Sequence, residues 1–76
     1  MAKRVKDKKI VHEVALRLSN LRTEKGMTLQ ELAHEADIEL TQVHRVLNGN
    51  HDPQLSTVEK IVKALGSDMG TLFKGL

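Results

Sequence analysis

Apolar residues recur at intervals of three and four along most of the chain, a spacing typical of amphipathic α-helices. Between residues 29 and 47 this pattern predicts two short helices joined by a tight turn. Their inward positions are Leu32, Ala33 and Ala36 in the first helix, and Val43, Val46 and Leu47 in the second. The small Ala33 lets the helices cross closely, and Ile38 is expected beneath the turn. Asp37 falls where the chain reverses, and Asp tolerates the left-handed backbone needed there.

A long helix is predicted before this pair. It is expected to start between Val5 and Ile10 and to end near Lys25, because Gly26 can adopt the left-handed C-cap conformation. Its apolar residues step by three and four, which predicts one buried stripe on this helix. The stripe consists of Val11, Val14, Leu18 and Leu21.

Capping signals delimit the two short helices. Thr28-x-x-Glu31 is a capping box, in which a hydroxyl and a carboxylate satisfy two backbone amides, and its helix is expected to end near Ala36. The next helix is predicted from about Leu40 to Asn48. Its cap position is Glu39, a poorer cap than Ser or Asp, and Gly49 ends it.

Two helices are predicted in the remaining chain. Pro53 closes a loop that cannot continue as a helix, and Ser56-x-x-Glu59 forms a second capping box. The buried stripe of this fourth helix is Val58, Ile61, Val62 and Leu65. Gly66 ends that helix, and Ser67 is the expected cap of a last short helix from Asp68 to about Phe73. No strand pattern appears, so the sequence predicts an all-α domain.

The two central helices have the spacing of a helix-turn-helix, and the chain from Leu18 to Phe73 resembles the phage-repressor-like family of the Cro/C1 or XRE type. The resemblance implies a five-helix, lambda-repressor-like domain that binds duplex DNA, usually as a dimer. The matching residues are Arg22, Gly26-Met27-Thr28, Leu32-Ala33, Ile38, Val43, Asn48-Gly49, Pro53, Leu55, Thr57 and Ala64-Leu65-Gly66.

The sequence departs from the family pattern at five positions, one of which is Glu39, where the family commonly has a hydroxyl residue. Leu29 stands where the family often has a phosphate-binding Gln, and Leu40 where it often has Gln or Ser. Asp37 replaces a Gly that is usual at the turn. Leu47 occupies the position of a Glu that pairs with Arg22 in the family. Arg22 is therefore expected to be either solvated or free to contact phosphate.

Charge is distributed unevenly along the chain. The 76 residues contain 12 basic and 10 acidic side chains, a net charge of +2. Residues 1–9 hold five basic residues and one acidic residue, while residues 10–76 hold seven basic and nine acidic residues and so carry −2. We therefore divide the chain into a basic leader, 1–9, and a helix-turn-helix domain, 10–76. The leader is interpreted as a phosphate-binding arm, a solvated tail or the start of the first helix.

Several function classes are disfavoured by what the sequence lacks. Without cysteine the chain has no disulfide or thiolate metal site, and no apolar run is long enough for a signal peptide or a membrane span. The four histidines form no metal-binding motif, so no metal or cofactor is expected. No phosphate-binding loop or activated nucleophile suggests an enzyme. Phe73 is the single aromatic residue of the chain, which disfavours RNA and single-strand binding.

The outward face of the helix predicted over 40–48 is the candidate site. Arg45 can donate two hydrogen bonds to guanine, and Thr41 offers a hydroxyl and a methyl group to base edges. The expected base-reading residues are Leu40, Thr41, Gln42, His44 and Arg45. The expected phosphate contacts are Thr28, Gln30, Asn48, Asn50 and His51. The alternative reading of this face is an ordinary solvated surface.

The sequence therefore predicts a sequence-specific protein that binds double-stranded DNA, a cytoplasmic repressor-like regulator of prokaryotic or phage origin. The alternative is a protein-interaction module of the same fold, such as an antitoxin that binds a toxin. A homodimer is expected as well, because Met69, Phe73 and Leu76 cannot all reach a small core once Leu72 points inward. Alternatively, Phe73 folds back over the first helix.

Overall fold

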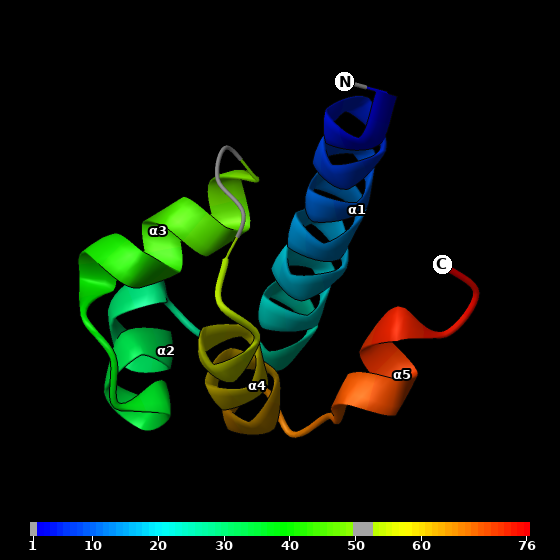
Figure 1. The fold of residues 1–76 in the computed structure, drawn as a ribbon. Helices are drawn as coiled ribbons and strands as arrows, with labels where there is room; N and C mark the ends of the chain where they lie inside the picture. The colour runs from blue at the N-terminus through cyan, green and yellow to red at the C-terminus, as the bar shows by residue number, and fades with distance from the viewer. Residues whose placement is uncertain (1, 50–52) are drawn as a thin grey trace.

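The computed structural model describes residues 2–49 and 53–76, with side chains described from residue 9 onward. Five helices follow one another: α1 (Ala2–Lys25), α2 (Leu29–Ala36), α3 (Leu40–Asn48), α4 (Leu55–Ala64) and α5 (Met69–Phe73). Figure 1 shows the crossed pair α2 and α3 on one side of α4 and α5 on the other, and α1 packs against both α3 and α5. The described residues contain no strand, so the expected all-α, five-helix fold is confirmed.

The turn between α2 and α3 has the predicted geometry. Thr28 caps α2, because its Oγ1 accepts from the Glu31 amide at 3.1 Å while the Glu31 carboxylate accepts from the Thr28 amide at 2.8 Å. Asp37 ends α2 in the left-handed region with φ 57° and ψ 46°. Ile38 is half-buried and packs against the core, as expected.

Three expected helix starts are wrong. α1 begins at Ala2, earlier than predicted, so the basic residues from 3 to 9 belong to its first turns. α4 begins at Leu55 with Gln54 as its cap, because the amides of residues 57 and 58 already donate to the Gln54 carbonyl. The predicted Ser56 capping box therefore lies inside the helix.

The third correction concerns α5. Its cap is Asp68, whose carboxylate accepts from the Thr71 amide at 2.7 Å, and not Ser67. The Ser67 amide instead donates to the Val62 carbonyl at 3.0 Å and helps to close α4. An ionised carboxylate accepts such a bond more strongly than a hydroxyl does, which favours Asp68 as the cap.

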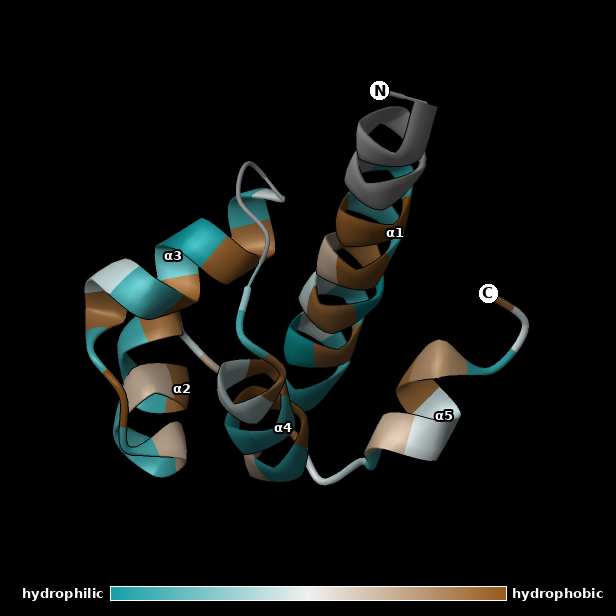
Figure 2. Ribbon diagram, in the orientation of Figure 1, coloured by the Kyte–Doolittle hydropathy of each residue, from teal (hydrophilic) through white to brown (hydrophobic). Residues whose placement is uncertain are grey.

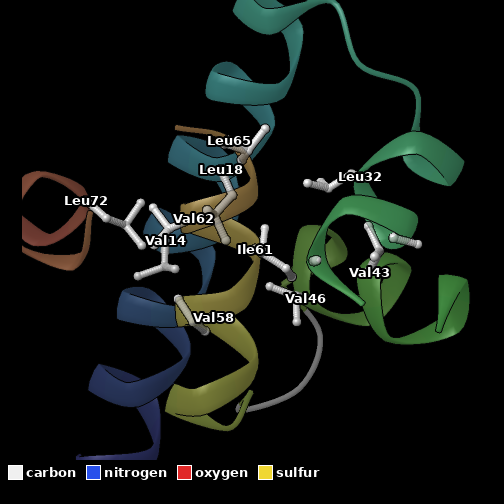
Figure 3. Packing of buried hydrophobic residues seen from close by; sticks show 12 residues of the cluster. Val14, Leu18, Leu32, Val43, Val46, Val58, Ile61, Val62, Leu65 and Leu72 are labelled. Carbon is white, nitrogen blue, oxygen red and sulfur yellow. The ribbon is translucent and has the colours of Figure 1, made fainter. Parts of the chain in front are cut away.

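The core forms around α4. Its predicted stripe is confirmed: Val58, Ile61, Val62 and Leu65 are all buried. Side chains from the other helices converge on this stripe in Figure 3, where they are Val14 and Leu18, Leu32, Val43 and Val46, and Leu72. Burying each such side chain contributes roughly 1.5–3 kcal/mol. This common core holds the crossed pair α2 and α3 in a fixed orientation.

Arg22 is half-buried and has a contact that the sequence did not predict. Its Nη1 donates to the Met27 carbonyl at 2.8 Å, and the Met27 amide donates to the Arg22 carbonyl at 3.2 Å. The Nε atom is buried and has no hydrogen-bond partner among the described residues. Arg22 therefore closes the connection between α1 and α2.

A second arginine fixes α5. Arg17 on α1 donates from Nη1 to the carbonyl oxygens of Leu72 at 2.8 Å and Lys74 at 2.6 Å. Its Nε lies 3.8 Å from the Glu13 carboxylate. Because the last carbonyls of a helix have no partner inside it, this guanidinium supplies the donors that the end of α5 lacks.

Candidate nucleic-acid interface

The two faces of α3 differ sharply in chemistry. Val43 and Val46 are buried against the core, and Leu47 beside them is half-buried. The other face is polar in Figure 2, and its described side chains are exposed: Thr41, Gln42, His44, Arg45 and Asn48. Because the inward valines fix the rotation of the helix, these groups stand together on its outer side. A helix with such a face fits the major groove of B-DNA.

Two of the expected base-reading residues have other contacts in this structure. Leu40 is half-buried and packs against the core, so only part of its side chain faces outward. The Gln42 Oε1 accepts from the Glu39 amide at 3.4 Å, at the start of α3. A Gln42–base contact would require the side chain to give up this weak bond. Thr41, His44 and Arg45 make no hydrogen bond or ion pair that the structure describes.

The start of α2 supplies groups of a different kind. Thr28 and Gln30 are exposed there, and α2 packs directly against α3. The first amides of a helix have no acceptor within it, and the macrodipole adds partial positive charge, so phosphate oxygens bind readily at such a position. Glu31 opposes this effect, because its carboxylate lies at the same helix end, where it accepts from the Thr28 amide. Thr28 uses its hydroxyl as an acceptor, which leaves the hydroxyl proton for donation.

The N-terminal part of α1 reaches beyond the end of α3. The C-terminal end of α3 lies against α1, where an added Cβ at Gly49 would be 3.2 Å from the Ala15 Cβ and 3.4 Å from the His12 Cα. Since a helix rises about 1.5 Å per residue, α1 continues roughly 13 Å beyond this contact to residue 3. The backbone of residues 2–9 therefore extends past the end of α3.

The remaining sequence predictions concern phosphate contacts at and after the end of α3, metal ligands and membrane spans. Asn50 and His51, expected to contact phosphate, lie outside the described residues, whereas Asn48 is exposed at the end of α3. His12, His34 and His44 are exposed, and the described residues contain no group of three potential metal ligands. None of the described helices is both long and apolar enough to cross a membrane.

A family model for a Cro/C1-type helix-turn-helix DNA-binding domain matches residues 17–74. This match covers α2 to α5 and the second part of α1. The chain belongs to the Cro/C1-type helix-turn-helix family. Comparisons with curated proteins and with solved structures gave no significant match. The basic segment 1–9 lies outside the matched region.

Because the chain belongs to the Cro/C1-type family, the exposed face of α3 is part of a DNA-binding domain. The domain is a DNA-binding domain, and the crossed pair α2 and α3 is its helix-turn-helix. Sequence reasoning identified this pair and the outward face of α3. It missed Arg17, whose acceptors lie 55 and 57 residues away along the chain and are backbone carbonyls, so no side-chain pattern signals the contact.

Proposed function

We propose that this protein is a sequence-specific regulator of transcription that acts as a repressor by occupying a duplex DNA site. α3 enters the major groove, and the observation that carries this proposal is the opposition of buried Val43 and Val46 to an exposed polar face. Arg45 donates two hydrogen bonds to a guanine, while Thr41 and His44 contact neighbouring base edges. The remaining base-facing groups are Gln42 and the outward part of Leu40.

Phosphate contacts hold α3 in register on the duplex. In this proposal Thr28 and Gln30 bind one strand from the start of α2, and Asn48, Asn50 and His51 bind the backbone beyond the end of α3. The basic segment 1–9 supplies the positive charge that residues 10–76, with net −2, do not. Phosphate contacts of this kind set affinity and orientation but carry no base preference.

Arg45→Ala tests the reading role of α3. After selection of a preferred site from random duplexes, the substitution should weaken binding to that site by ~1–3 kcal/mol and relax the preference at one base pair. Lys74→Ala is the matched control, because it also removes one positive charge but follows α5, which lies on the other side of α4 from α3 in Figure 1. Fluorescence anisotropy at fixed salt measures both.

The outcomes of this experiment distinguish a base-reading role of Arg45 from a phosphate contact. An equal loss on all duplexes would make Arg45 a phosphate contact and not a base reader. Selection that yields no preferred sequence would contradict sequence-specific binding altogether. A Lys74→Ala effect as large as that of Arg45→Ala would show that net charge, and not the face of α3, determines affinity.

A protein-interaction module of the same fold is the second candidate. The observation that favours it is the negative net charge of residues 10–76, which is unfavourable for a DNA-binding surface. Salt distinguishes the two candidates. DNA binding weakens steeply as salt rises because counterions are released, whereas a largely apolar protein contact does not.

We also propose that the protein binds DNA as a homodimer. Two-fold pairing places two recognition helices about 34 Å apart, one turn of DNA, on a palindromic site. Leu72 is buried as predicted, but Met69 and Phe73 are half-buried against the core. Of the four, only Leu76 is strongly exposed, so α5 alone offers little apolar surface for pairing.

A further inference from the structure

The outward side of α3 includes one apolar side chain beside its polar groups. With about 100° of rotation per residue from buried Val43, an arc of roughly 140° begins at Leu40 and ends at Arg45. The side chains on this arc are Leu40, Thr41, His44, Arg45 and Asn48. Gln42 falls outside the arc, where it lines a hollow together with Lys60 of α4. Leu40 therefore shares one side of α3 with groups that are proposed to read bases.

Leu40 differs from every other side chain on this arc, because it has no hydrogen-bond donor or acceptor. It is half-buried and packs against the core. This packing holds the side chain in place, so little conformational freedom is lost when a ligand contacts its exposed part. The first turn of α3 thus presents a fixed apolar group next to polar groups that can bond to base edges.

The base edges in the major groove of duplex DNA are polar, with the exception of the methyl group at C5 of thymine. 5-Methylcytosine carries the same methyl group at the same position. The two bases differ beside it, since thymine has the O4 acceptor and cytosine has the N4 donor. A leucine side chain can bond to neither of these groups, so it responds only to the methyl group.

We infer that Leu40 recognises the C5-methyl group of a pyrimidine, whether this base is thymine or 5-methylcytosine. Contact with this group removes apolar surface of both partners from water, whereas an unmethylated pyrimidine leaves Leu40 facing polar base edges. The inference rests on the proposed reading of DNA by α3, and it names the chemical group that one side chain of α3 recognises. Methylation of a cytosine at this place should therefore strengthen binding of the protein to its site.

The test changes the DNA and leaves the protein intact. In the preferred duplex selected from random sequences, each thymine is replaced in turn by deoxyuridine, which removes only the C5-methyl group. At the position that Leu40 contacts, the dissociation constant should rise about three- to fivefold, as expected for one buried methyl group. A second pair of duplexes carries cytosine or 5-methylcytosine at this position, and the methylated duplex should bind about three- to fivefold more tightly. Fluorescence anisotropy at one salt concentration measures all of these dissociation constants.

Two protein variants identify the side chain that reads the methyl group. Leu40→Gln keeps a similar volume but presents a polar amide, so the ratio of the deoxyuridine to the thymine dissociation constant should fall to about one. Thr41→Ser is the matched control, because it removes the other methyl-bearing side chain of the arc and keeps the hydroxyl; it should retain the ratio. Thermal unfolding checks that both variants are folded. Because the deoxyuridine and 5-methylcytosine comparisons use the wild-type chain, they remain decisive even if Leu40→Gln loses stability.

Different results overturn the inference and the proposed function. A preferred duplex in which no change of thymine to deoxyuridine alters the dissociation constant would overturn the inference, while sequence-specific binding would stand. A ratio that is lost in Thr41→Ser but kept in Leu40→Gln would assign methyl reading to Thr41 and overturn the inference as well. So would a 5-methylcytosine duplex that binds no more tightly than its cytosine counterpart. Selection that yields no preferred duplex would contradict the proposed function itself, and the inference with it.

Discussion

Arg17→Met isolates what the guanidinium contributes to the attachment of α5. Methionine keeps most of the aliphatic stem but removes the donors to the Leu72 and Lys74 carbonyls, at 2.8 and 2.6 Å, and the charge facing Glu13. Leu72 remains buried, so α5 keeps its apolar anchor. We expect the domain to stay folded with a less stable α5.

The size of the effect follows from the exposure of each contact. A hydrogen bond to a charged group contributes about 1.5–3 kcal/mol, and the half-buried bond to Leu72 should fall at the low end of that range. The bond to Lys74 is exposed and should contribute only about 0.5 kcal/mol. The Glu13 pair is long, at 3.8 Å, and partly solvated, so it adds at most about 0.5 kcal/mol. The total is about 2 kcal/mol, or roughly 8–16 °C in melting temperature.

Urea unfolding followed by circular dichroism measures the free energy of unfolding, and amide exchange shows where stability is lost. Exchange should accelerate most in residues 69–76. Two control variants separate the contribution of the ion pair from that of the hydrogen bonds. Glu13→Gln removes only the ion pair and should cost at most about 0.5 kcal/mol. Arg17→Lys keeps the charge but loses the planar fork, so it should retain about half of the stabilisation.

The reasoning would be refuted if Arg17→Met destabilised the domain no more than Glu13→Gln does. The two carbonyl bonds would then contribute nothing net, and Leu72 alone would hold α5. Uniform acceleration of exchange across all five helices would also contradict a local role for this arginine.

Two further predictions concern the close approach at α3 and the charge at the start of α1. Gly49→Ala should lower the free energy of unfolding in urea by about 2–4 kcal/mol, and Gly26→Ala by only about 1 kcal/mol. Both glycines have φ +69°, but only Gly49 has neighbours within 3.4 Å of an added Cβ. Equal costs would contradict a packing role for Gly49. Replacing the five basic residues of segment 1–9 with Gln should lower the slope of log K against log salt by roughly 2–3 in DNA binding. An unchanged slope would show that this segment makes no phosphate contact.

The sequence predicted the core and the exposed face of α3 well because both depend on periodicity. Val43 and Val46 determine the inward side of α3, and a helix leaves its opposite face to solvent. Capping boxes predicted the first residues of helices less reliably. Thr28 and Ser56 carry the same signature, but only Thr28 starts a helix, because backbone bonds to Gln54 begin α4 before Ser56 is reached. A local signature does not show which of several possible starts is used.

Contacts between distant segments could not be predicted from the pattern. The sequence offered two roles for Arg22, solvation or phosphate binding, and the structure shows a third, a bond to the Met27 carbonyl. The acceptor is a backbone atom, which every residue possesses, so no side-chain spacing identifies it. Phe73 posed a similar problem, since its position against α1 depends on how α5 is attached through Arg17 and Leu72. For both Arg22 and Phe73, tertiary packing determined where the side chain lies.

The position of α1 links the helix-turn-helix to the basic segment 1–9. This helix contacts the end of α3 through His12 and Ala15, and its N-terminal turns belong to the segment that carries +4. If the protein binds DNA as the proposed homodimer, a copy already bound to the duplex favours docking of the next copy. Occupancy of a palindromic site should accordingly rise more steeply with protein concentration than occupancy of a half-site.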